Sequence, residues 1–121
     1  MARIPRRILG KTGLEISALG FGSLELRGIV AGIGRPIDER QAETILNEVL
    51  DAGINYIDTS VDYGGSEERI GKFISARRSE FILASKCGCP PDLSKFAPEE
   101  RTRYGVPLPR LHDYSRNNII N

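Results

Sequence analysis

The stretch "GINYIDTSVDYG", residues 53–64, runs from a short apolar segment into a cluster of polar side chains. Residues 54–57 are mostly apolar, which is typical of a buried strand. Asp58 stands at the C-terminal end of this run, and Tyr63 follows five residues later. A carboxylate and a phenol at the end of a buried strand indicate a candidate functional edge of a sheet, because α/β folds collect their chemistry there.

The segment before this strand predicts an amphipathic helix. Asp38 and Gln41 have the spacing of a capping box, in which each side chain bonds a free backbone N–H at the helix start. Gly53 suits the left-handed conformation that ends many helices. Apolar residues recur at helical spacing between these two ends. They are Ala42, Ile45, Leu46, Val49 and Leu50.

The segment after the strand predicts a second helix over residues 66–78. Ser66 is a candidate N-cap, Glu67 and Glu68 suit the positive end of the helix dipole, and Arg77 and Arg78 suit its negative end. The apolar face of this helix consists of Ile70, Phe73 and Ile74.

Residues 81–84 form another apolar run and predict a further strand, which is followed by Ser85 and Lys86. The two strands begin about 27 residues apart, close to the roughly 30 residues of a βαβ unit. Apolar strands separated by amphipathic helices predict a parallel sheet in an α/β fold.

The two ends of the chain complete the expected organisation. Residues 4–23 predict two strands around a glycine-bearing turn, with residues 18–22 continuing into a buried strand, and residues 24–37 predict a loop. Residues 87–111 are polar and rich in proline, and residues 112–121 predict the start of a third helix. We expect residues 1–121 to be one unit: a hairpin, about three parallel strands, two helices and the start of a third helix. Such a set is too small to close a barrel and leaves a strand edge uncovered, so we expect the front part of a larger fold.

The composition excludes several classes of function. The chain has 121 residues, a net charge of +1, 40% hydrophobic and 27% charged residues, which are ordinary values for a soluble domain and indicate neither nucleic-acid nor membrane binding. Cys87 and Cys89 are too close for a local disulfide, and His112 is the only histidine, so we expect reduced thiols, a cytoplasmic location and no metal site. We expect a structural or solvent-exposed role for His112.

Two glycine patterns suggest phosphate binding, but both are incomplete. Gly10-Lys11-Thr12 resembles the end of a P-loop, but Pro5 stands where the first glycine of that motif belongs. Gly20 and Gly22 open a dinucleotide fingerprint, but Glu25 stands at the third glycine position. We therefore interpret both as turns or strand ends.

Asp58, Tyr63 and Lys86 form the candidate catalytic site. Asp58 and Lys86 follow neighbouring parallel strands, which lie roughly 4.8 Å apart, so their side chains can meet. Tyr63 lies on the loop after the Asp58 strand. A phenol has an ordinary pKa near 10, and a neighbouring ammonium favours its ionised form, so Lys86 is expected to lower the pKa of Tyr63. With Asp58 orienting Lys86, Tyr63 can act as a general acid toward an oxygen that gains negative charge.

Three stretches of the sequence resemble the aldo-keto reductase family: "RRILGKTGLEISALGFGS", "DAGINYIDTSVDYGGSEERIGKFI" and "FILASKCG". The resemblance implies that the chain is the N-terminal portion of a (β/α)8 TIM barrel preceded by a β-hairpin. It implies NADPH-dependent reduction of a small-molecule carbonyl, an aldehyde or ketone, to an alcohol. Asp58, Tyr63 and Lys86 correspond to three members of the family's catalytic tetrad, and Gly22, Ser23 and Asp58 to positions beside the nicotinamide.

The fourth tetrad member is a histidine at the end of a strand that this sequence does not contain, and the family's main cofactor-binding segments come later still. His112 precedes the third predicted helix and does not replace that histidine. We therefore expect the 121 residues alone to be inactive and to self-associate through exposed apolar faces. Two alternatives stay open: a non-catalytic regulatory or interaction fragment with the same fold, and a different barrel enzyme that uses Lys86 for a Schiff base.

Overall fold

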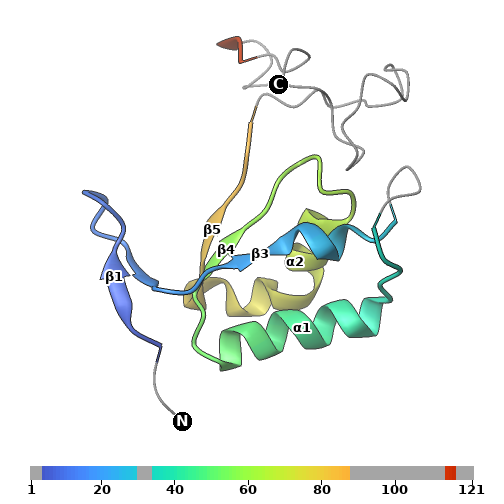
Figure 1. The fold of residues 1–121 in the computed structure, drawn as a ribbon, viewed down its shortest axis with the longest axis horizontal. Helices are drawn as coiled ribbons and strands as arrows, with labels where there is room; N and C mark the ends of the chain where they lie inside the picture. Colours follow the sequence, from blue (N-terminus) through green and yellow to red (C-terminus); the bar gives the residue numbers. More distant parts are fainter. Residues whose placement is uncertain (1–3, 30–33, 88–113, 117–121) are drawn as a thin grey trace.

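The computed structural model describes residues 4–29, 34–87 and 114–116 (Figure 1). The described strands are β1 (Arg6–Ile8), β2 (Glu15–Ser17), β3 (Phe21–Gly22), β4 (Tyr56–Asp58) and β5 (Ile82–Ala84). The α-helices are α1 (Glu39–Asp51) and α2 (Ser66–Ile74), and two 3₁₀ segments are η1 (Ser23–Arg27) and η2 (Ser75–Glu80). The prediction of a third helix and of a long polar loop falls mostly on residues outside the described ranges.

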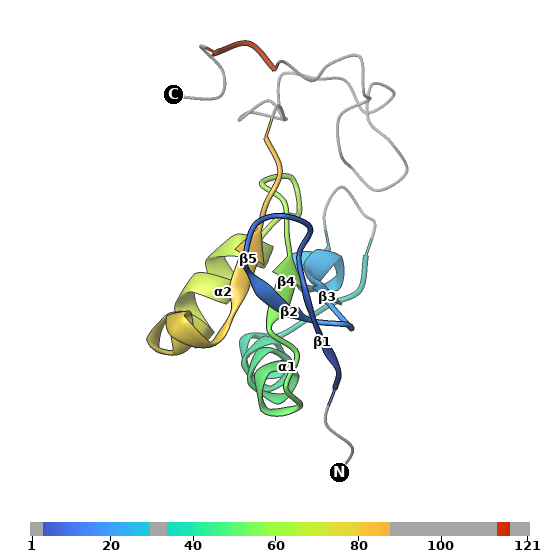
Figure 2. The same ribbon diagram turned by 90° about the vertical axis from the view of Figure 1, so that its left-hand side faces the viewer.

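Strands β3, β4 and β5 form a parallel sheet in sequence order, with α1 between the first two and α2 between the last two. This order confirms the α/β organisation expected from the spacing of the apolar segments. The core lies where both helices pack on one face of the sheet (Figure 2). Its buried residues are Leu26, Ala42, Leu46, Leu50, Ile57, Ile70, Ile74 and Phe81.

Helix α1 has the ends that the sequence predicts. The Asp38 side chain accepts a hydrogen bond from the Gln41 backbone N–H at 2.7 Å, and the Gln41 side chain accepts one from the Asp38 N–H at 3.1 Å. Gly53 follows the helix with φ +87°, a conformation that favours glycine. The chain therefore turns sharply from α1 into β4.

Three local predictions were wrong. Residues 24–37 were expected to form a loop, but residues 23–27 form η1, in which Leu26 is buried in the core. Helix α2 ends at Ile74 rather than Arg78, and the chain continues to Glu80 as the 3₁₀ segment η2. Ser66 is not the N-cap, because Gly65 holds that position and Ser66 is a buried residue of the first helical turn.

Strands β1 and β2 pair antiparallel and attach to the start of β4 through Asn55. Asn55 Oδ1 accepts a hydrogen bond from the Ser17 N–H at 2.6 Å, and Asn55 Nδ2 donates to Glu15 O at 3.0 Å. The Asn55 N–H also donates to Ser17 Oγ at 3.0 Å. Asn55 is buried, and its hydrogen bonds keep β1 and β2 at the N-terminal end of the sheet, away from Asp58.

Arg69 joins η1, α1 and α2 on the helical side of the sheet. Its Nη1 donates to Leu26 O at 2.6 Å, and its Nε donates to Glu39 Oε1 at 3.0 Å. Glu39 also pairs with Lys72 at 2.9 Å. These contacts fix the segment that follows β3 against the two helices. No helix in the described part of the chain is long and apolar enough to cross a membrane.

Candidate functional site

The C-terminal ends of the three parallel strands lie at one edge of the sheet. Gly22, Asp58 and Ala84 are in register across β3, β4 and β5. Ile57 is fully buried beneath the helices, whereas Asp58 is partly exposed, because successive side chains of a strand point to opposite faces. Lys86 follows β5 by two residues, so that it can reach back over the end of β4.

Lys86 and Asp58 form a direct ion pair at this edge. Lys86 Nζ donates to Asp58 Oδ2 at 2.8 Å and to the backbone oxygen of Thr59 at 2.9 Å. The two side chains are 43% and 42% exposed, so the pair is open to solvent and to a ligand. The Lys86 ammonium is thus held by two oxygens, the Asp58 carboxylate and the Thr59 carbonyl. Together they restrict the position of the positive charge.

The surroundings of Lys86 act on its pKa in opposite directions. Desolvation is the largest single effect and lowers the pKa, but hydrogen bonding to Asp58 and to Tyr63, with their charges, outweighs it. The pKa of Lys86 is therefore raised above its ordinary value of 10.5. A raised folded-state pKa stabilises the fold below the unfolded-state value, and that stabilisation is lost as the pH rises through the raised pKa. Lys86 is consequently an ammonium throughout the physiological range.

Asp58→Asn is expected to lower the pKa of Lys86, because the neutral amide attracts the ammonium less strongly than the carboxylate does. The measurement is a pH titration of the Lys86 side chain by NMR in a chain labelled at lysine Cε. Asp62→Asn is the matched control, since the Asp62 carboxylate lies on the same loop but bonds Ser60, and it should leave the titration in place. An unchanged Lys86 pKa in Asp58→Asn would contradict the pairing.

Tyr63 reaches the same edge from the loop between β4 and α2. Two consecutive turns shape this loop: the Tyr63 N–H donates to Ser60 O at 3.0 Å, and the Ser66 N–H donates to Tyr63 O at 2.9 Å. Ser60, which is buried, also donates its hydroxyl to Asp62. Lys86 Nζ lies 4.8 Å from the centroid of the Tyr63 ring. The structure thus brings together the three residues that the sequence singled out.

The resemblance implies that Gly22 and Ser23 bind the cofactor, and the two residues differ in exposure to solvent. Gly22 is exposed, and a Cβ added to it would meet no atom within 4 Å, so there is open space beside the end of β3. Ser23 is fully buried, and its hydroxyl donates to Asp58 O at 3.0 Å. The Ser23 hydroxyl is therefore occupied inside the protein. The predicted contact of Ser23 with the cofactor stays a prediction, and it would involve the backbone of Ser23 rather than its side chain.

Sequence reasoning missed four residues that surround the site. Thr59 and Ser66 are buried hydroxyls behind Asp58, and Glu67 accepts a hydrogen bond from Ser85, the residue before Lys86. Serine and threonine beside a strand end are common, so the sequence carried no signal that these hydroxyls meet. The sequence pattern indicates only that the charge of Glu67 is favourable at the start of a helix.

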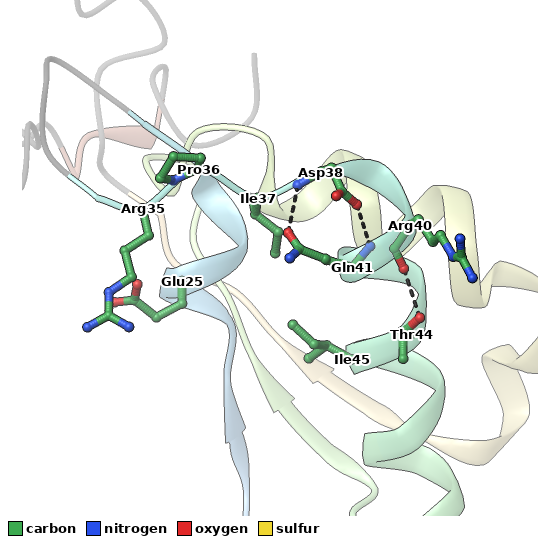
Figure 3. A pocket seen from close by; sticks show the side chains of 9 residues that line it. All are labelled: Glu25, Arg35, Pro36, Ile37, Asp38, Arg40, Gln41, Thr44 and Ile45. Carbon is green, nitrogen blue, oxygen red and sulfur yellow. Dashed lines mark hydrogen bonds between the residues drawn. The ribbon is translucent and has the colours of Figure 1, made fainter.

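A cavity of about 540 Å³ lies away from this edge, between η1 and the start of α1 (Figure 3). None of the three candidate catalytic residues lines it. Its apolar wall includes Ile37 and Ile45, and its charged rim includes Glu25, Arg35 and Arg40. We therefore regard it as an uncovered side of α1, separate from the candidate active site.

No group of acidic, cysteine and histidine side chains within the described ranges is arranged to hold a metal ion. Cys87 is exposed and has a free thiol. Cys89 and His112 lie outside the described residues, so their predicted roles stay predictions.

The C-terminal edge of the parallel sheet thus carries an ion pair and a phenol, and the comparisons with known proteins give the family of the chain. Residues 18–121 match the Aldo/keto reductase family. The chain belongs to this family of oxidoreductases.

Two curated proteins are similar to part of the chain. The chain is 45% identical over 93 residues to L-galactose dehydrogenase of Arabidopsis thaliana, covering 73% of this chain and 28% of that protein. It is 34% identical over 83 residues to "Probable voltage-gated potassium channel subunit beta" of the same plant, covering 64% of this chain and 24% of that one. The chain thus spans about a quarter of the length of these curated relatives.

The fold is also similar to that of a solved structure named "PA4992, the putative aldo-keto reductase" of Pseudomonas aeruginosa. It superposes with a TM-score of 0.64 at 36% identity, covering 74% of this chain and 36% of that one.

Proposed function

We propose that this chain contributes the Asp58–Tyr63–Lys86 site of an NADPH-dependent oxidoreductase that reduces an aldehyde or ketone to an alcohol. The observation that carries the proposal is that Lys86 Nζ contacts Asp58 Oδ2 at 2.8 Å while lying 4.8 Å from the centroid of the Tyr63 ring. We propose that the protein acts in the cytoplasm, where the thiol of Cys87 stays reduced.

Tyr63 is the proton donor in this proposal. The carbonyl carbon of the substrate gains a hydride, and the phenolic proton of Tyr63 passes to the carbonyl oxygen, which gives the alcohol. The phenolate that remains is stabilised by the Lys86 ammonium, and Asp58 keeps the ammonium in place. Solvent can then return a proton to Tyr63, because the site is open.

The residues at the sheet edge fit the nicotinamide end of NADPH. The open space beside Gly22 adjoins the register partner Asp58, whose side chain is 42% exposed, so a flat ring can lie against this edge. We propose that the backbone at Gly22 and Ser23 and the side chain of Asp58 hold it. When bound, the reduced nicotinamide supplies the hydride. We propose that other segments of the protein supply the phosphate and adenosine contacts, as the resemblance to the family implies.

The proposal is tested in a chimera in which this chain replaces the aligned segment of the Arabidopsis L-galactose dehydrogenase. The chimera should oxidise or reduce substrate with a change in nicotinamide absorbance, whereas the 121-residue chain alone, which lacks the tetrad histidine, should give no turnover with NADPH and an aromatic aldehyde. A folded chimera without turnover would contradict the proposed function. Robust turnover by the 121 residues alone would contradict the proposed need for further segments.

A regulatory role is the second candidate, because one relative is named as a channel subunit. An ion-paired Lys86 beside Tyr63 favours catalysis over this alternative, since a purely structural surface does not require the arrangement. A chimera that binds NADPH with unchanged affinity but gives no turnover would favour the regulatory role.

We also propose that the isolated chain self-associates. Leu83 is in register with fully buried Ile57 yet is 37% exposed, and Ile45 on α1 is also 37% exposed. Both belong to surfaces that other elements of a complete barrel would cover, and the outer edge of β5 is an unpaired strand edge within the described residues. Sedimentation should therefore show a mass that rises with concentration. A monomer with a sharp, concentration-independent melting transition would contradict this prediction.

A further inference from the structure

The first turn of α2 lies directly behind the candidate active site and contacts it at two points. Ser66 lies behind the end of β4, and Glu67 reaches the residue that precedes Lys86. Ser66 is fully buried, and Glu67 is exposed and bonds Ser85 rather than the Lys86 side chain.

Ser66 belongs to a cluster of three fully buried hydroxyls with Ser23 and Thr59. Ser66 Oγ lies 2.8 Å from Ser23 Oγ, 3.0 Å from Ser23 O and 3.2 Å from Thr59 Oγ1. Ser23 Oγ in turn donates to Asp58 O at 3.0 Å. Because each hydroxyl has one proton, the bonds can run in one direction, from Thr59 to Ser66, from Ser66 to Ser23 and from Ser23 to Asp58.

This cluster ties together the end of β3, the end of β4 and the start of α2. It fixes the backbone at Asp58 and at Thr59, and these two residues supply both oxygens that hold the Lys86 ammonium. The position of the ammonium acceptors therefore depends on buried hydrogen bonds, which are costly to break because the partners are then left unsatisfied.

Glu67 acts on the segment that carries Lys86, the cationic partner in the ion pair with Asp58. Its Oε1 accepts a hydrogen bond from the Ser85 hydroxyl, which ties the segment after β5 to α2. Lys86 is the next residue, and it reaches over the end of β4 from this anchored position. The Thr59 N–H donates to Ala84 O at 2.8 Å and so holds the end of β5, two residues before Lys86, against the end of β4.

We propose that Ser66 and Glu67 are positioning residues, which set where Asp58 and Lys86 meet from two consecutive positions of one helix. The inference rests on the proposed function, because positioning matters to turnover only if the ion pair serves Tyr63. It predicts that removal of either residue changes the environment of Lys86 although neither contacts the Lys86 side chain.

The experiment measures the acetylation rate of Lys86 in the 121-residue chain, at a concentration where sedimentation shows the monomer, with the exposed Lys11 as the internal reference. Glu67→Ala should raise the rate at least about threefold. Only the free amine reacts, and lowering the pKa of Lys86 by roughly half a unit gives about three times as much free amine. Ser85→Ala should have the same effect as Glu67→Ala. The double variant should show no larger effect than either single variant, because both substitutions remove the same hydrogen bond. Glu67→Gln keeps an acceptor oxygen and should leave the rate unchanged.

Glu68→Ala is the matched control, since it removes the same charge from the same helical turn. An effect of Glu68→Ala equal to that of Glu67→Ala, or an equal effect of Glu67→Gln, would overturn the proposal in favour of a charge effect. Ser66→Ala should also raise the Lys86 rate. Circular dichroism would show whether Ser66→Ala unfolds the chain. If it does, the variants of Glu67, which is exposed, test the proposal.

The same variants in the chimera separate this inference from the proposed function. Glu67→Ala should lower kcat by about tenfold to a hundredfold with little change in cofactor affinity, as expected for a misplaced group, and Glu67→Gln should restore it. A response of Lys86 acetylation in a chimera without any turnover would overturn the proposed function and leave the positioning of Lys86 standing. An unchanged acetylation rate would overturn the positioning role whatever the turnover.

Discussion

Tyr63→Phe is expected to lower kcat of the chimera by about 10²- to 10⁴-fold, the usual contribution of a general acid. The phenyl ring keeps the packing of the loop but cannot give a proton to the developing oxygen anion. Cofactor affinity, measured by fluorescence titration with NADPH, should stay nearly the same, because the phenol is not proposed to hold the cofactor. The measurement compares single-turnover rates of the two proteins under saturating substrate.

Tyr56→Phe is the matched control for this substitution. Tyr56 lies on β4 two residues before Asp58, and it packs against Gly20 rather than against Lys86. Its loss of a hydroxyl should change kcat by no more than about twofold, as for most substitutions away from special features. A large loss of cofactor affinity in Tyr63→Phe, with kcat preserved, would mean that the role of Tyr63 is misassigned.

Lys86→Met should also cause a large loss of turnover, because it removes the only described cation beside Tyr63 and leaves Asp58 without its ion-pair partner. A loss of about a hundredfold or more is expected for a group that stabilises charge in the transition state. Lys86→Arg keeps the charge but changes its geometry, so it should recover part of the rate. Lys11→Met, on the exposed turn between β1 and β2, is the control.

The pH dependence gives a second view of Lys86. Since its pKa is raised above 10.5, Lys86 should stay charged at neutral pH, so turnover should not change there through this group. The support that Lys86 gives to Tyr63 should be lost only as the pH rises through the raised pKa of Lys86. Borohydride trapping of a substrate on Lys86 would instead support the Schiff-base alternative and contradict the role of Lys86 as the cation that supports Tyr63.

The local features of the fold were predictable where a few residues decide them. The capping box of Asp38 and Gln41 depends on contacts within one helical turn, and Gly53 is required by a positive φ. The order of strands and helices followed from apolar periodicity. The meeting of Asp58 and Lys86 followed from the rule that parallel strands end at the same edge, because each residue stands at such an end.

The features that could not be predicted depend on contacts between distant segments. Ser23 and Ser66 are 43 positions apart, and the packing of α2 against η1 brings their hydroxyls together. Helix α2 ends at Ile74, and Arg77 in the following 3₁₀ segment pairs with Asp51 of α1, a distant residue that the helix pattern does not indicate. Single-residue propensities carry no information on such pairings.

A double-mutant cycle between Tyr63 and Lys86 in the chimera tests most directly whether the two residues act as one unit. If Lys86 serves only to support proton transfer by Tyr63, Tyr63→Phe with Lys86→Met should lose no more kcat than Tyr63→Phe alone, because the supported step is already gone. Losses that multiply in the double variant would show two independent roles and would contradict the shared site.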